Sequence, residues 1–259
     1  MRCATRHLSL IRVLCLAGLS LMACRACAND ELLEFEVTYS GMTIGTMKLA
    51  QVQTADGTLT RSLHLKSSRW LATMGATIDD HIRSETARSP QGTCITVTKD
   101  VKENRFQRKE SFTFWPEAGI CMRTNRHQKT LERIEIPKDA HDMFALFLDL
   151  GKTLQHRNDP LTQELTLIAD GKIYPLHVET KAPERIRTEA GKMQAIEVNL
   201  TSPSTKLFSK AVPKRAYFAA HLPLLLAAEI KTPFGTIHAA LTSWKVNGVE
   251  RTWACDAAR

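Results

Sequence analysis

The stretch Phe35–Leu49, FEVTYSGMTIGTMKL, decides the fold of this 259-residue chain. In its first half Phe35, Val37 and Tyr39 alternate with polar residues. Alternation with a period of two predicts a strand that buries one face against a core. The dipeptide Ser40-Gly41 then predicts a tight turn into a second alternating segment. The stretch is therefore expected to form a β-hairpin with one apolar side.

The same pattern recurs along the chain, with Asp/Gly or Pro/Gly turn signals between short alternating segments and without a Pro/Gly/Ser-rich linker. We therefore predict a mainly β fold, in which antiparallel sheets form a curved half-barrel or a sandwich. Leu222–Ile230 is predicted to be one buried strand. Thr232-Pro233-Phe234-Gly235 is predicted to be the turn after it.

One short helix is predicted near residues 139–150. Asp139 suits the N-cap, Met143, Phe144 and Phe147 lie at helical spacing on a predicted core face, and Gly151 suits the end of the helix. Residues 29–259 are expected to form a single antiparallel β-rich domain. The alternative is two β halves joined by this helix.

Residues 1–28 resemble a secretory signal. Arg2, Arg6 and Arg12 precede the apolar run Val13–Ala23, and Ala26-Cys27-Ala28 matches the small-x-small pattern of a signal-peptidase site. We therefore expect cleavage before Asn29 and a soluble periplasmic protein. Leu21-Met22-Ala23-Cys24 offers an alternative, because it resembles a bacterial lipoprotein box. In that case Cys24 is acylated and the lipid anchors the protein to the outer membrane, its only expected contact with a membrane.

Charge and cysteine content change when the signal is removed. The loss of four arginines and no acidic residue lowers the formal charge from +8 to +4, and the remaining excess is scattered, so we expect no nucleic-acid partner. In the soluble alternative Cys94, Cys121 and Cys255 remain, an odd number that excludes a complete disulfide framework, whereas the lipoprotein alternative also retains Cys27. Cys94 and Cys121 are not expected to be bonded to each other, because a strand should lie between theirs and place them about 9.6 Å apart. Each is expected to be a thiol or a partner for Cys255 or Cys27.

No catalytic constellation is recognised in the sequence. It contains no Gly-x-Ser-x-Gly nucleophile motif and no zinc-binding Cys/His spacing. Asp79-Asp80-His81 is the densest ionisable group, but neighbouring residues of a strand point to opposite faces, so it is interpreted as a solvated strand segment. His64, His177 and His238 lie singly in strand patterns. We expect no catalytic residue, metal or cofactor.

Trp70, together with Tyr217 and Phe218, is the candidate lining of an apolar binding cradle. The alternative is that these aromatic side chains belong to the ordinary core.

In the order of its segments the sequence is similar to the bacterial exported family catalogued as domain of unknown function 3108. The matching segments are Phe35–Leu49, the helix near 139–150, Ala169–Lys172 with Tyr174, Ala190–Lys192 with Ala195, and Leu222-Pro223 through Phe234-Gly235 to Leu241. The resemblance implies an antiparallel β fold and an envelope location, and supplies no activity. One segment departs from the family pattern, because AYFAAH at 216–221 replaces an acidic, Trp-containing stretch.

These observations lead to two functional hypotheses. The first is a non-catalytic exported envelope protein that binds or carries an apolar envelope molecule, such as a lipid or an acyl chain. The second is a protein–protein interaction module that assists envelope assembly or polysaccharide export by contacting an envelope protein. A continuous apolar concavity would favour the carrier, and a filled core with an exposed apolar patch would favour the module.

Overall fold

The computed structural model describes residues 29–251, except 90–91, 126–129, 170, 189–190, 205–212 and 233–234. The predicted signal, the acylation candidate Cys24, Cys27, Cys255 and the Pro233-Phe234 part of the predicted turn lie outside the described residues. Within the described part, no helix is long and apolar enough to cross a bilayer.

Antiparallel strands make up most of the described chain. The strands are β1 (Asn29–Tyr39), β2 (Met42–Gln53), β3 (Leu59–Ser67), β4 (Asp79–Ser89), β5 (Gly92–Glu103), β6 (Phe106–Trp115), β7 (Ile120–Asn125), β8 (Thr130–Glu135), β9 (Ala140–His141), β10 (Thr162–Ala169), β11 (Lys172–Thr180), β12 (Glu184–Thr188), β13 (Gly191–Thr201), β14 (Arg215–Ala219), β15 (Leu225–Thr232), β16 (Gly235–Val246) and β17 (Val249–Glu250). The helices are α2 (Arg69–Thr73), α3 (Met143–Leu154) and the 3₁₀ turn η1 (Pro116–Ala118).

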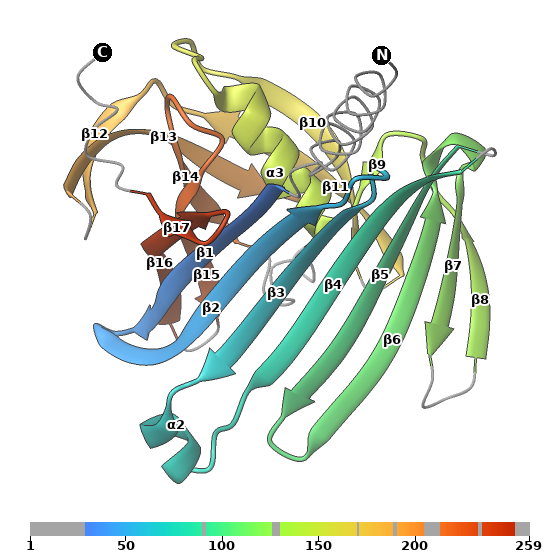
Figure 1. The fold of residues 1–259 in the computed structure, drawn as a ribbon, viewed down its shortest axis with the longest axis horizontal. Helices are drawn as coiled ribbons and strands as arrows, with labels where there is room; N and C mark the ends of the chain where they lie inside the picture. The colour runs from blue at the N-terminus through green and yellow to red at the C-terminus, as the bar shows by residue number, and fades with distance from the viewer. Residues whose placement is uncertain are drawn as a thin grey trace, which may run out of the picture.

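The strands join into one curved, open sheet, as the mainly β prediction required (Figure 1). Hydrogen-bonded ladders run from β8 through β7, β6, β5, β4, β3 and β2 to β1. From β1 they continue through β16, β15, β14 and β13 to β11 and β10. The pair β9–β10 is parallel, and the neighbouring ladders are antiparallel. The two predicted β halves therefore belong to a single sheet.

The hairpin predicted from Phe35–Leu49 is formed by β1 and β2. Ser40 and Gly41 have φ angles of 50° and 77°. Positive φ at both positions gives a two-residue turn a twist that matches the twist of the flanking strands. Phe35 is 1% exposed and lies opposite Met47 on one neighbouring strand and Leu241 on the other. The hairpin therefore occupies the middle of the sheet, where it is paired on both sides.

The free cysteines Cys94 and Cys121 lie on β5 and β7, with β6 between them. Ile95, next to Cys94, pairs with Phe114, and Phe114 pairs with Cys121. The predicted up-down-up order of these three strands is confirmed.

Helix α3 differs from its prediction at both ends. Asp142, and not Asp139, is the N-cap: its Oδ1 accepts hydrogen bonds from the backbone N of Phe144 at 2.7 Å and of Ala145 at 3.1 Å. The two residues before it, Ala140 and His141, pair as β9 with β10, so the helix begins only after that contact. Gly151 lies inside the helix, which ends at Leu154.

The core-facing side of α3 also differs from the predicted stripe. Phe144 is buried as expected, but Met143 and Phe147 are only partly buried. The buried residues of the helix are Phe144, Ala145, Leu146, Leu150, Gly151 and Leu154. Leu146, Leu150 and Leu154 pack with β10, β11, β13 and β14 in the largest core cluster of the described residues.

The predicted strand Leu222–Ile230 is shorter at its start. Leu222 and Leu224 form a turn, in which the N of Leu224 donates to the O of Leu222 at 2.7 Å, and β15 begins at Leu225. Its burial alternates, because Leu226 and Ala228 are buried while their neighbours are partly exposed. The apolar run Leu224–Ala228 therefore has only one buried face, although all of its residues are apolar.

Candidate functional site

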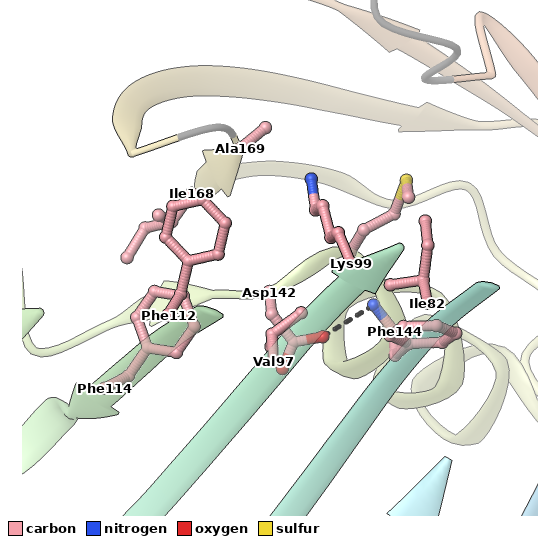
Figure 2. Close-up of a pocket in the computed structure, with 10 residues that line it drawn as sticks. Ile82, Val97, Lys99, Phe112, Phe114, Asp142, Phe144, Ile168 and Ala169 are labelled. Carbon is pink, nitrogen blue, oxygen red and sulfur yellow. Dashed lines mark hydrogen bonds between the residues drawn. The ribbon is translucent and has the colours of Figure 1, made fainter. Parts of the chain in front are cut away.

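An apolar cavity lies where the first turn of α3 and the end of β10 meet the inner face of β4, β5 and β6 (Figure 2). We call it the inner cavity; its lining residues are Ile82, Val97, Lys99, Phe112, Phe114, Asp142, Met143, Phe144, Ile168 and Ala169. The inner cavity is small: the centre of a water-sized sphere has about 40 Å³ of space inside it. The hollow around it, including space open to solvent, measures about 510 Å³.

Strand alternation produces the apolar wall of the inner cavity. Val97 pairs directly with Phe112 across β5 and β6, and both side chains are buried on the inner face. Phe112 and Phe114 lie two residues apart on β6, with ring centroids 6.3 Å apart. Ile168 of β10 packs in the same cluster. The wall therefore combines the hairpin of β5 and β6 with β10, which is distant from it in the sequence.

Asp142 is the acidic group of the inner cavity. Its Oδ1 caps α3, whereas its Oδ2 is buried and has no hydrogen-bond partner among the described residues. Burial raises the pKa of the Asp142 carboxyl above its usual value, and the nearby Asp149 acts in the same direction, while Arg61 opposes it. A protonated Oδ2 would be able to donate a hydrogen bond into the cavity.

Basic side chains lie beside the apolar wall. The Nζ of Lys99 lies 5.7 Å from the ring centroid of Phe112, and the guanidinium carbon of Arg123 lies 5.8 Å from the same centroid. Arg123 also binds the buried carboxylate of Glu110 at 2.6 Å, and Arg108 binds its other oxygen. The cavity thus has an apolar interior with cationic groups beside it.

This arrangement suits binding better than chemistry. Lys99 and Asp142 are the ionisable residues among those lining the cavity, and the lining contains no Ser, Cys or His. Apolar walls with a few placed polar groups are the usual composition of a small-molecule site.

The structure does not bring the three predicted lining residues together. Trp70 lies on α2, at the opposite end of the molecule from β14, and its indole N donates to the O of Thr43 at 2.7 Å (Figure 1). Phe218 is buried in the core against Phe147, so the alternative interpretation as ordinary core holds for it. Tyr217 lines a separate open hollow with Ile186 and Leu226. Adjacent residues of one strand face opposite sides, which separates Tyr217 from Phe218.

Asp79, Asp80 and His81 do not all converge, as predicted, because Asp80 faces the other side of β4 and accepts a hydrogen bond from the N of Lys102, but Asp79 and His81 do meet. Asp79 and His81 are two positions apart on β4 and share a face, and His64 of β3 lies directly opposite His81. The ligand atoms of His64, Asp79 and His81 all lie within 4.8 Å of one another. The spacing of Asp79 and His81 in the sequence could have indicated that these two side chains share a face. The contribution of His64 could not be predicted, because it depends on how β3 pairs with β4.

The fold defines the chain as a β-barrel-like protein built on one curved antiparallel sheet. A family model described as protein of unknown function (DUF3108) matches residues 34–242, and the chain belongs to that family. It is similar in structure to a beta-barrel-like protein of domain of unknown function DUF1849 from Brucella abortus, with a TM-score of 0.55 and 8% identity. That match covers 85% of this chain and 97% of the other, and it shows the fold alone. No curated protein matches the sequence.

Proposed function

We propose that this protein is a non-catalytic, exported envelope protein that binds an apolar envelope molecule with an anionic end, such as a lipid or a fatty acid. The observation that carries the proposal is the inner cavity, in which Val97, Phe112 and Ile168 supply an apolar wall beside the cation Lys99. An alkyl chain would replace water on the apolar wall, at about 25 cal/mol per Å² of buried surface.

The anionic end is proposed to lie against Lys99 and Arg123, whose charged groups flank the ring of Phe112. Ordinary ligand pockets measure roughly 300–1,000 Å³, and the inner cavity is much smaller. Entry of a chain is therefore proposed to move the first turn of α3 away from β5 and β6. Asp142 would favour such a movement, since opening gives its unpartnered Oδ2 access to water.

Export is supported by the sequence of residues 1–28, in which a basic start, a short apolar run and a small-x-small site follow one another. Mass spectrometry of the N-terminus of envelope-purified protein should find either Asn29 or an acylated Cys24. An intact Met1 on protein from the cytosol would contradict export.

Binding is tested in two stages. Native mass spectrometry of the envelope-purified protein should show a bound mass that lipid extraction removes. The extracted protein should then bind palmitate saturably, measured by displacement of a fluorescent fatty acid. A folded protein that carries no lipid and does not bind palmitate would contradict the proposal.

Two variants and a matched control localise the ligand. Ile168→Trp should abolish palmitate binding by filling the cavity, and Lys99→Gln should weaken it by roughly tenfold, the lower end of the range for a charge-assisted hydrogen bond. Lys102→Gln is the control, because Lys102 belongs to the same strand but faces the other side of the sheet. Equal losses for Lys99→Gln and Lys102→Gln would place the ligand elsewhere. Circular dichroism shows whether each variant is folded.

A second candidate function, an interaction module, is favoured by β8. This strand pairs with β7 and with no other described strand, and most of its residues are exposed, Leu131 by 68%. An unpaired edge can accept a strand from another protein. A photo-crosslinker at position 131 should then capture an envelope protein in intact cells, while one at Thr98, inside the sheet, should not.

A further inference from the structure

The outer face of the sheet carries a histidine–carboxylate cluster that the inner cavity does not use. We propose that His64, Asp79 and His81 bind a divalent transition-metal ion of the zinc class. The proposal is independent of the ligand-binding function, since these side chains and the lining of the inner cavity lie on opposite faces of β3 and β4.

Strand register fixes the three side chains. His64 of β3 is paired directly with His81 of β4, and Asp79 lies two positions before His81 on the same face. Directly opposite side chains in such a ladder have Cβ atoms roughly 4.5–5.5 Å apart, close enough for both imidazoles to reach one ion. The ladder from Leu59 to Lys66 holds this register.

The ligand atoms already converge. The Nε2 atoms of His64 and His81 lie 2.8 Å and 3.3 Å from the same oxygen, Oδ1 of Asp79. Zinc bonds of about 2.0–2.1 Å in tetrahedral geometry separate neighbouring ligand atoms by roughly 3.3 Å. The two imidazole rings are stacked, with centroids 3.9 Å apart and planes 19° from parallel, so binding an ion requires the rings to rotate until both Nε2 atoms face it.

The neighbouring charges permit a cation. Lys48 and Arg83 flank the cluster on the outer face, but Lys48 binds Glu34, and Arg83 binds Glu85 at 3.2 Å. Lys66, the partner of Asp79 in the ladder, also carries a positive charge. Asp100, the partner of His81, carries a negative charge that Lys109 binds at 3.1 Å and Lys102 at 3.8 Å. The cluster is 32% to 51% exposed in its side chains, so an ion can enter from solvent.

The donor set selects the kind of metal. Two imidazoles and one carboxylate suit zinc and its neighbours, whereas calcium and magnesium prefer oxygen ligands alone. Three protein ligands leave a fourth position open. His81 also lines a groove of about 250 Å³, whose other lining residues are Arg83, Thr98, Lys99, Asp100, Lys109, Glu110 and Ser111.

His177 provides a matched control. It also touches two carboxylates, but its Nδ1 meets Glu164 and its Nε2 meets Glu179, so its partners lie on opposite sides of the ring. No convergent set of ligand atoms is formed there. Removal of His177 should therefore leave metal binding unchanged.

The test titrates the untagged, metal-free protein with Zn²⁺ by calorimetry and with Co²⁺ by visible absorption. We expect one ion per chain, a tetrahedral Co²⁺ spectrum and a rise in melting temperature with Zn²⁺. His64→Ala, His81→Ala and Asp79→Asn should each weaken binding at least about tenfold, because loss of a residue that only hydrogen-bonds to a metal ligand already costs about 10–100-fold. His177→Ala should bind like the wild type. The proposal is wrong if the wild type shows no saturable binding, or if the folded His64→Ala/His81→Ala double variant binds equally well.

Discussion

Gly151 of α3 lies directly against the backbone of Pro223: a Cβ added at Gly151 would be 3.3 Å from both the carbonyl carbon and the oxygen of Pro223. The Cδ1 atom of Phe218 would be only 3.4 Å away. The glycine therefore sets the distance between the helix and the turn that precedes β15. This close approach explains why a glycine is placed inside a helix, where it costs about 1 kcal/mol relative to alanine.

The contact predicts a size dependence at position 151. Gly151→Ala should be nearly neutral, because the gain in helix propensity offsets the slight overlap with Pro223. Gly151→Val should lower the free energy of unfolding by about 1–3 kcal/mol, the usual cost of overpacking. Urea unfolding measures both changes. Lys152→Ala, at the neighbouring exposed position, is the control, and a stabilised Gly151→Val would contradict the contact.

The buried side of α3 should dominate its contribution to stability. Leu146 is 1% exposed, whereas Met143 is only partly buried. Leu146→Ala should therefore lower the free energy of unfolding by roughly 2–5 kcal/mol, and Met143→Ala by clearly less. Chemical denaturation of the two variants provides the measurement. Equal losses would show that both residues are equally buried in solution.

The two described cysteines should differ in reactivity. Burial raises the pKa of the Cys121 thiol to about 11, and its side chain is 0% exposed, while Cys94 is partly exposed. The thiolate is the reactive form. Iodoacetamide at pH 8 should therefore leave Cys121 unmodified in the native protein and label it after unfolding, as peptide mass mapping would show. Rapid native labelling of Cys121 would contradict its place in the core.

The buried carboxyl of Asp142 predicts a pH dependence of stability. Its pKa is raised in the folded state, so the folded protein holds this proton more tightly than the unfolded chain. The contribution of Asp142 to stability is fully present below its unfolded pKa of about 4 and is lost as the pH rises through the raised folded value.

Asp142→Asn isolates that effect, because asparagine keeps an N-cap oxygen but does not titrate. Relative to the variant, the wild type should lose free energy of unfolding as the pH rises above about 4, measured by urea denaturation across pH 4–7. Parallel curves for the two proteins would contradict the raised pKa. Compared with Asp142→Asn, which also does not titrate, Asp142→Ala removes the cap and should cost about 0.5–2 kcal/mol at every pH.

Local patterns were sufficient to predict the central strands and the turn between them. The hairpin β1–β2 follows from alternation and from Ser40-Gly41, because burial of one face and the twist of a tight turn depend on residues close in the sequence. The ends of α3 were predicted less well. Asp139 and Asp142 both suit an N-cap, and the choice between them depends on the pairing of β9 with β10.

The sequence by itself determined the fold class, the central hairpin and the order of β5, β6 and β7, since each depends on a pattern within a few dozen residues. Only the tertiary structure decided which residues meet. His64 faces His81 through the register of β3 and β4. Phe112 packs with Ile168, and both line one cavity with Phe144, through the curvature of the sheet around α3. Register and curvature are set by hydrogen bonds and packing between distant segments, so the periodicity of one strand cannot show which side chains converge.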